Sequence, residues 1–447
     1  MKKKFFNRKL SSFQIIIFGF MGVILAGALL LMLPFASRND GSAKFEDALF
    51  TAVSAACVTG LITQDTATYW TEFGQAIILL LIQIGGFGVV TIGAALAMVS
   101  GRKIGLMQRS TMQDSISAPQ VGGIVRFTAF AIKITLAVEA AGALLMMPSF
   151  IKEFGIGKGI WYSVFHSVSA FCNAGFDLMG TREKFSSLTS FAFNIPVNIV
   201  IMLLITIGGL GFLTWDDIRV HKFRMKKYRM QSKVILATSG ILILLPAVYY
   251  FFEFGGEKWD MTIGQRITAA MFQAVTPRTA GFNTVDLGML GGGGMIIMIA
   301  LMLIGGSPGS TAGGMKTTTI AVLYSAAFSV FRKEKSTKFF GRRISDETVK
   351  TAAAILLMYV TIFLTGAAAI SIIDDQPIRE CLFETSSAIA TVGLSLGLTP
   401  QLGTASHIIL IIMMFLGRVG TLTVIYAAVS GNHSNVSRLP EEKITVG

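Results

Sequence analysis

Four short segments of this chain share one pattern, and this repetition restricts the fold more than any other feature of the sequence. Each segment starts with Phe, continues with small and hydroxyl residues, and reaches a glycine about ten positions later. The segments are FTAVSAACVTGL at 50–61, FHSVSAFCNAGF at 165–176, FQAVTPRTAGF at 272–282, which is one residue shorter, and FETSSAIATVGL at 383–394. Their glycines recur roughly every 110 residues. Such self-similarity indicates one structural unit built four times.

The sequence around these segments is apolar enough to cross a lipid bilayer. Hydrophobic residues make up 53% of the chain and charged residues 14%, whereas soluble domains carry about 25% charged residues. A spanning helix needs about 20 apolar residues. Eight runs have the required length, at 11–33, 74–99, 127–150, 191–213, 233–252, 292–330, 351–373 and 405–430.

The charges between the runs predict the orientation. Lys and Arg concentrate in 2–9, 102–109, 219–229 and 332–343, while acidic residues collect in the other connections. Cytoplasmic loops carry the excess of Lys and Arg, so both termini are predicted to lie in the cytoplasm. The net charge of +13 is explained in this way and does not indicate a nucleic-acid partner. The N-terminal MKKKFFNRK carries no convincing cleavage site and is typical of a bacterial cytoplasmic membrane protein.

These patterns predict an all-α integral membrane protein with eight full spans. Four span–pore-helix–loop–span repeats are expected around a pseudo-fourfold central pore. The first repeat takes residues 1–100 with an N-terminal cytoplasmic segment, and the second takes 101–218. The third takes 219–340 with an interrupted sixth span, and the fourth takes 341–447 with a C-terminal cytoplasmic tail.

The four glycine loops are candidates for a cation filter. Non-helical backbone at membrane depth persists only where it is buried in protein or lines an aqueous cavity. A single loop of this kind is more often a packing device, but four aligned copies favour a pore. The loops contain no acidic side chain, and rings of backbone carbonyls can replace the hydration shell of potassium. The predicted filter residues are Val58, Thr59, Gly60, Asn173, Ala174, Gly175, Thr279, Ala280, Gly281, Thr391, Val392 and Gly393.

The chain resembles the Trk/Ktr/HKT superfamily of potassium transporters, and within it the membrane subunits of bacterial Ktr systems. The resemblance lies in the four repeats, the glycine in every loop, TPRTAGFN at 276–283 and the interrupted sixth span. It implies potassium as the substrate, because a glycine in all four loops goes with potassium preference in that family. It also implies a homodimer with one pore per chain and a ring of cytosolic regulatory subunits. Any nucleotide is then expected on that partner only, and no covalent cofactor on this chain.

The interruption of the sixth span is a candidate gate. IGGSPGSTAGGMKTTT at 304–319 contains far more Gly, Ser, Thr and Pro than a kink requires. It is not a phosphate loop, because Met315 separates the second glycine from Lys316 and no strand precedes it. An unwound loop below the filter is expected, and the resemblance implies the same. The predicted gate residues are Gly305, Gly306, Ser307, Pro308, Gly309, Ser310, Thr311, Ala312, Gly313, Gly314, Lys316 and Arg418.

Arg418 belongs to this set because it is the only charge in the eighth run and stands roughly at its centre. Inserting a central arginine costs about 2.5–3.5 kcal/mol or more, so a pore-facing position is expected, with bonds to the loop. Lys316 is the weaker candidate, because it could simply extend toward the interface. Glu139 is interpreted as a helix-packing polar residue beside Lys133, with sodium or proton coupling as the alternative. Arg278 is expected to pair with a loop acid such as Asp286.

Two other readings of the sequence remain open. A potassium symporter coupled to sodium or protons would use broken helices around a midplane site, although these repeats all have one topology. An enzyme is disfavoured, since neither the four histidines nor the three cysteines form a catalytic or metal-ligand set. Cys57 and Cys172 occupy matching repeat positions and are interpreted as small filling side chains.

Overall fold

The computed structural model describes residues 11–38, 41–89, 91–93, 105–116 and 122–420. The predicted cytoplasmic N-terminal segment, the end of the second run and the C-terminal tail therefore lie wholly or largely outside the described residues. The α-helices are α1 (Ser12–Leu31), α2 (Phe45–Ala56), α3 (Thr66–Tyr69), α4 (Glu72–Phe87), α6 (Leu106–Ile116), α7 (Ile124–Phe154), α8 (Ile156–Phe171), α9 (Ile195–Gly209), α10 (Phe212–His221), α11 (Met230–Glu253), α12 (Ile263–Val275), α13 (Gly292–Leu303), α14 (Thr317–Phe331), α15 (Asp346–Ile373), α16 (Ile378–Ile389) and α17 (Thr404–Val419). A two-stranded antiparallel hairpin is formed by β1 (Lys338–Phe339) and β2 (Arg342–Arg343).

One helical arrangement occurs four times along the chain. A long helix packs on the short helix that follows it, in the pairs α1–α2, α7–α8, α11–α12 and α15–α16. An irregular loop then leads to a further apolar helix, which is α4, α9, α13 or α17. The four short helices contain the repeated Phe, and all four of these Phe side chains are fully buried: Phe50, Phe165, Phe272 and Phe383.

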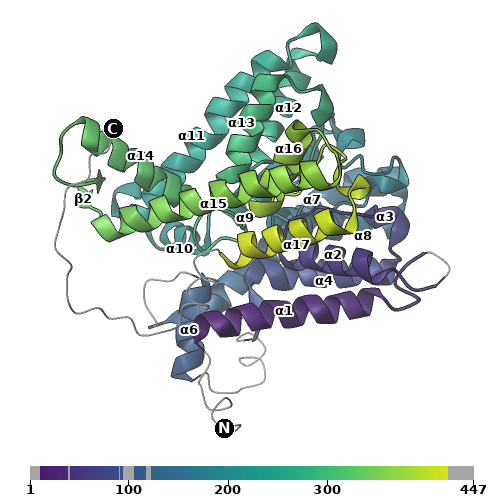
Figure 1. Cartoon of the computed structure of the whole chain (residues 1–447), viewed down its shortest axis with the longest axis horizontal. Coiled ribbons are helices and arrows are strands. Elements are labelled where there is room, and N and C mark those ends of the chain that lie inside the picture. The colour runs from purple at the N-terminus through teal and green to yellow at the C-terminus, as the bar shows by residue number, and fades with distance from the viewer. Residues whose placement is uncertain (1–10, 39–40, 90, 94–104, 117–121, 421–447) are drawn as a thin grey trace.

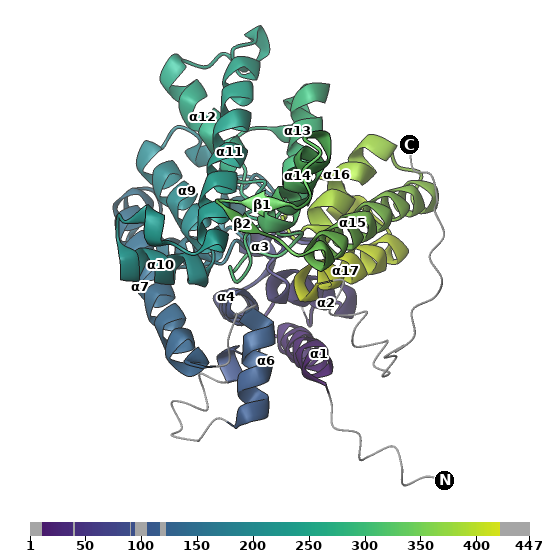
Figure 2. The same cartoon turned by 90° about the vertical axis from the view of Figure 1, so that its left-hand side faces the viewer.

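The four units pack in a closed ring. The last helix of each unit contacts the short helix of the next, in the pairs α4–α8, α9–α12, α13–α16 and α17–α2. Figure 2 shows the same order, with the purple, blue, teal and yellow-green parts of the chain arranged around a common centre. In Figure 1, α15 and α17 run nearly parallel, as expected for helices that pack along their length.

The lengths of the apolar helices differ between the two halves of each unit. Among the described residues, the long helices α1, α7, α11 and α15 are each apolar and long enough to cross a membrane. The other apolar helices are shorter or broken: α4, α13, α14 and α17 are shorter than a span, and α9 and α10 form a pair bent by 96°. The sequence predicted the interruption of the sixth run but not the bend in the fourth. The total of eight spans and the repeat boundaries stay predictions.

Local sequence explains where several helices begin. Ser11 accepts a hydrogen bond from the backbone of Gln14, whose side chain bonds back to Ser11, and this capping box starts α1. Thr262 and Gln265 form the same box at α12. Ser345 caps α15, and the acidic Asp346 and Glu347 follow in its first turn, where they favour the positive end of the helix dipole.

Candidate functional site

The four glycine loops meet one another at the centre of the ring of units. A side chain on Gly60 would collide with the carbonyl oxygen of Ala174 in the second loop. In the same way Gly175 faces Ala280, Gly281 faces Val392, and Gly393 faces Thr59 of the first loop, which closes the circle. Eleven of the twelve predicted filter residues are buried, and Gly393 is half-buried. The structure thus brings together all four loops that the sequence singled out.

The four loops share an unusual backbone conformation. The first filter residue of each has a positive φ although none is glycine: 58° at Val58, 59° at Asn173, 65° at Thr279 and 52° at Thr391. The glycine two positions later is also positive, at 93° for Gly60, 69° for Gly175, 81° for Gly281 and 92° for Gly393. Left-handed backbone at non-glycine residues is strained and concentrates at functional sites, where the surrounding structure holds it in place.

A hydroxyl residue four positions after the repeated Phe holds each loop. Its backbone carbonyl accepts the N–H of the middle filter residue in every unit: Ser54 from Thr59 at 2.8 Å, Ser169 from Ala174 at 2.8 Å, Thr276 from Ala280 at 2.9 Å and Ser387 from Val392 at 2.8 Å. Its hydroxyl bonds the filter as well, accepting from Gly60 and Gly393 in the first and fourth units. In the second and third units it donates to the carbonyls of Phe176 and Phe282. Sequence reasoning missed these residues, although their fixed spacing from Phe was visible.

The residue directly after the Phe fixes the chain beyond the filter in two units. His166 is fully buried, and its Nε2 receives the N–H of Leu178 at 3.3 Å. Glu384 is also fully buried, and it accepts from the N–H of Leu398 at 3.3 Å and from the hydroxyl of Thr399 at 2.9 Å. These polar side chains therefore support the loops rather than line them.

The interruption of the sixth run has no helix between Leu303 and Thr317. The segment 305–314, called here the intramembrane loop, lies against the break between α9 and α10. Backbone hydrogen bonds join the two: Ser307 N–H to Gly209 at 3.0 Å, Thr311 N–H to Gly208 at 3.3 Å, and Phe212 N–H to Gly309 at 2.8 Å. The intramembrane loop is therefore hydrogen-bonded to the bend in the fourth run, which the sequence did not predict.

Replacing Gly211 with alanine is expected to weaken the contact between the intramembrane loop and this bend. Gly211 has a φ of 88°, and a Cβ there would lie 2.5 Å from the carbonyl oxygen of Pro308. Gly155 is a matched control, because its φ of 79° is similar but nothing lies within 4 Å of its Cβ position. Both substitutions carry backbone strain of about 1–3 kcal/mol. Only Gly211→Ala adds the collision, which should lower stability by a further 1–3 kcal/mol or so.

Thermal unfolding of the two purified variants in detergent, followed by intrinsic fluorescence, measures this difference. Equal shifts in melting temperature for Gly211→Ala and Gly155→Ala would contradict this prediction, because they would show that the intramembrane loop can move away from the added methyl group without a loss of stability.

The intramembrane loop also contacts two of the four glycine loops. The hydroxyl of Thr311 donates to the carbonyl of Phe171, the last residue of α8, at 2.9 Å. A side chain on Gly313 would collide with the hydroxyl of Thr391, and one on Gly314 would lie 2.7 Å from the carbonyl of Ala390. The intramembrane loop is thus packed directly against the second and fourth glycine loops and the short helices that precede them.

Arg418 joins the intramembrane loop to the first unit. Its guanidinium donates to the carbonyl of Thr311 at 2.5 Å and to the carbonyls of Gly85 and Gly86 in α4. The sequence placed Arg418 roughly at the centre of a run, but α17 ends at Val419, so Arg418 lies in the last turn of the described helix. Lys316 does not extend away: its ammonium folds back on the carbonyls of Ala312 at 2.9 Å and Gly313 at 3.4 Å.

The last helix of each unit ends in a related glycine motif. The motif reads GGFG at 85–88, GGLG at 208–211, GGSPG at 305–309 and GRVG at 417–420. In three units the first glycine lets the helix approach the carbonyl of the final residue of the short helix, which is Ala56, Phe171 or Ile389. The second position is glycine in the first three motifs, and Arg418 occupies it in the fourth. This alignment is visible in the sequence but was not used to predict the site.

A cavity of about 320 Å³ lies beside the intramembrane loop. Two cationic side chains, Lys316 and Arg418, line it together with glycines from three of the motifs. These glycines are Gly86, Gly88, Gly309, Gly417 and Gly420. The two basic side chains favour a positive potential in this space.

Two expectations about single buried charges were wrong. Arg278 does not pair with Asp286; its guanidinium donates to the hydroxyl of Ser239 in α11 at 3.0 Å. Glu139 does not bond Lys133 but accepts from Gln83 in α4 at 3.2 Å, and the Cys172 thiol lies 3.7 Å from its carboxylate. In both cases the partner belongs to a neighbouring helix, which the linear sequence does not reveal.

Comparisons with known proteins show which family, relatives and solved structures this chain resembles. The family model described as "TrkH: Cation transport protein" matches residues 2–437. The chain is 37% identical to the potassium/sodium uptake protein NtpJ of Enterococcus hirae, over 100% of this chain and 99% of that protein. It is 36% identical to the Ktr system potassium uptake protein B of Bacillus subtilis, over 97% and 96% of the two chains. The crystal structure of the potassium transporter TrkH from Vibrio parahaemolyticus shares the fold, with a TM-score of 0.75 and 17% identity over 96% of this chain and 87% of that one.

Proposed function

Because the chain belongs to the TrkH family of cation transport proteins, we propose that it takes up potassium across the bacterial cytoplasmic membrane through the ring of four glycine loops. The single observation that carries this proposal is the closed circle in which each filter glycine faces the next loop. One chain thereby surrounds one axis with four equivalent backbone segments. The names of the relatives, a potassium/sodium uptake protein and a potassium uptake protein, support potassium as the ion.

Selectivity in this proposal comes from backbone carbonyls of the twelve filter residues. The loops offer no acidic side chain, so the ion loses water to carbonyl oxygens instead. The short helices α2, α8, α12 and α16 end just before the loops, and the negative ends of their dipoles favour a cation there. The bonds from Ser54, Ser169, Thr276 and Ser387 keep each loop in its strained conformation.

The gate in this proposal is the intramembrane loop together with Lys316 and Arg418. The loop contacts two of the filter loops, and Arg418 joins it to α4 by hydrogen bonds. Both side chains place positive charge in the 320 Å³ cavity, where it repels a cation leaving the filter. Opening requires the loop to move away from the break between α9 and α10.

We further propose that the end of the molecule bearing the hairpin and the basic segments faces the cytoplasm, with both termini on that side. The excess of Lys and Arg in 219–229 and 332–343 supports this orientation. The same basic segments are candidate contacts for a cytosolic nucleotide-binding regulatory ring. A homodimer with one pore in each chain completes the proposed assembly.

A potassium symporter coupled to sodium is the second candidate, favoured by the name of the Enterococcus relative, a potassium/sodium uptake protein. The buried Glu139 beside Gln83 and Cys172 would be its candidate coupling residue. A conducting pore and a symporter differ in whether potassium flux requires sodium.

Ion flux in proteoliposomes tests both candidates. The purified protein is reconstituted in potassium-loaded vesicles, an ionophore compensates the charge, and efflux is recorded against external sodium and against choline. A second set of vesicles is loaded with both potassium and sodium, and in a third experiment sodium is placed inside and potassium outside. Potassium efflux in both media with little sodium flux is expected from a selective pore, whereas potassium efflux that occurs only when sodium is also inside the vesicles would establish the symporter.

Two outcomes contradict the main proposal. Equal flux of potassium and sodium would refute selectivity by the glycine ring. No flux in either medium, even after the regulatory ring is added, would refute the pore itself.

A further inference from the structure

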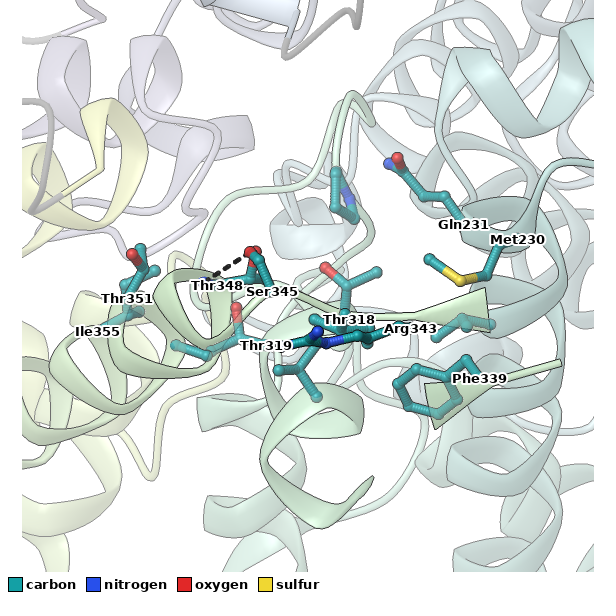
Figure 3. A pocket seen from close by; sticks show the side chains of 15 residues that line it. Met230, Gln231, Thr318, Thr319, Phe339, Arg343, Ser345, Thr348, Thr351 and Ile355 are labelled. Carbon is teal, nitrogen blue, oxygen red and sulfur yellow. Dashed lines mark hydrogen bonds between the residues drawn. The ribbon is translucent and has the colours of Figure 1, made fainter. Parts of the chain in front are cut away.

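A second cavity lies at the end of the molecule that carries the hairpin. It is an open cavity of about 520 Å³, lined by residues of α11, α14 and α15 and of the strands β1 and β2. Figure 3 shows labelled side chains from all of these elements facing the common space. Pro308 of the intramembrane loop forms part of its wall, and Ile355 lines both this cavity and the 320 Å³ cavity beside Arg418. An occupant would therefore touch the proposed gate.

One part of the cavity wall is apolar. Val234, Val322, Ile344 and Ala352 are buried residues that line it, and Pro308 lies with them. Val322, Ile344 and Ala352 also form a small hydrophobic cluster apart from the main core. A wall of branched side chains and a proline suits a hydrocarbon chain better than a sugar or a planar base.

The other part of the wall is polar and contains groups that can still form hydrogen bonds with a ligand. The hydroxyls of Thr318, Thr319 and Thr351 and the amide of Gln231 line the cavity and make no side-chain hydrogen bond with the described residues. Arg343 extends from β2 beside Thr318 and Thr319 in Figure 3. Among the described residues Arg343 has one ion pair, to Asp346 at 3.6 Å, and this pair is weak because both side chains are exposed.

Arg343 is the only charged residue among the described residues that line the cavity, and the chain segments that flank it carry more basic than acidic residues. The segment 332–343, which includes the hairpin, carries six Lys or Arg and a single acid, Glu334. The preceding segment 219–233 adds further Lys and Arg near the start of α11. Basic pockets between membrane helices on the cytoplasmic side are suited to anionic lipid headgroups.

We propose that this cavity binds an anionic phospholipid of the inner leaflet. The phosphodiester contacts Arg343 and the free hydroxyls, and an acyl chain lies over Val322 and Ile344 as far as Pro308. The bound lipid holds the intramembrane loop in one position and so couples the composition of the leaflet to the gate. The placement in the inner leaflet rests on the proposed orientation, whereas binding itself does not depend on ion flux.

Lipid binding to the purified full-length protein tests the proposal directly. Native mass spectrometry in detergent counts phosphatidylglycerol molecules retained per chain, with phosphatidylcholine and inorganic phosphate as comparison probes. Arg343→Gln removes the charge, and Ala352→Phe fills the apolar part. Arg342→Gln is the matched control, because Arg342 is the neighbour on β2 and does not line the cavity. Each test variant is expected to weaken phosphatidylglycerol binding about tenfold, as the loss of one charged hydrogen bond or of the acyl site predicts.

The comparison probes separate the possible ligands. Phosphatidylglycerol should bind, while phosphatidylcholine and inorganic phosphate should not compete with it. Equal retention of phosphatidylglycerol by wild type, Arg343→Gln and Ala352→Phe would overturn the proposal, and so would competition by phosphate alone. A protein that binds lipid as expected but shows no potassium flux would contradict the proposed function and leave the lipid site standing.

Discussion

Arg418→Ala is expected to raise potassium flux about tenfold or more, because a hydrogen bond from a charged group is worth about 1.5–3 kcal/mol and each 1.4 kcal/mol changes a population tenfold. Arg418 makes such bonds to Thr311 of the intramembrane loop and to Gly85 and Gly86 of α4. Their loss frees the loop from α4 and removes positive charge from the ion path. Rubidium uptake into proteoliposomes measures the effect.

Two further variants separate the causes of this increase. Arg418→Lys keeps the charge but cannot span the same carbonyls with a planar fork, so an intermediate flux is expected. Arg219→Ala removes an exposed arginine of α10, which pairs with Asp216 and lies over the ring of Phe130, and it should leave flux unchanged when no regulatory ring is present. Wild-type flux in a folded Arg418→Ala protein would contradict the gate proposed for this residue.

Gly393→Ala is expected to abolish most of the preference for potassium over sodium. Gly393 has a φ of 92°, and an added Cβ would collide with the carbonyl of Thr59 in the neighbouring filter loop. That carbonyl must turn or move, and displaced carbonyls no longer match the hydration shell of potassium. We expect the ratio of potassium to sodium flux to fall about tenfold or more, with lower potassium flux as well.

Gly397→Ala is the matched control for this substitution. Gly397 lies four residues beyond Gly393 in the same connection and has a similar φ of 84°, but nothing lies within 4 Å of its Cβ position. Backbone strain is therefore common to both variants, and only the collision differs. Vesicle flux with each cation in turn gives the ratio. An unchanged ratio in Gly393→Ala would contradict the filter assignment.

Much of the architecture could be read from the sequence because it repeats. Phe at one position and glycine about ten residues later located the four short helices and loops, and the structure brings the four loops into contact. The interruption at 305–314 was also predictable, since Gly, Ser, Thr and Pro replace apolar residues there. The bend between α9 and α10 was missed because it falls near the end of the apolar run at 191–213, where a helix is expected to end anyway. Its only local signal is GGLG at 208–211, which becomes informative when it is aligned with the other three motifs.

Partners of buried charges were harder to predict than the elements that carry them. Asp286 and Lys133 were chosen for closeness in sequence or for opposite charge. The structure instead gives Arg278 a hydroxyl from α11 and Glu139 an amide from α4. Such contacts depend on how neighbouring helices rotate against each other, and a single sequence does not contain that information. Arg418 was singled out correctly as unusual, but its hydrogen bonds to α4 became visible only in three dimensions.

Because one polypeptide forms the whole ring, each of the four units can have a different sequence. The second position of the glycine motif is occupied by Gly86, Gly209, Gly306 and Arg418, so one arginine stands where fourfold symmetry would otherwise require four. An assembly of four identical subunits would repeat any substitution around the axis, and four guanidinium groups could not share the same small space. When one gene encodes all four units, mutation and selection can act on each unit separately. One chain can therefore carry a single long interruption and a single arginine, whereas a homotetramer would carry four copies of each.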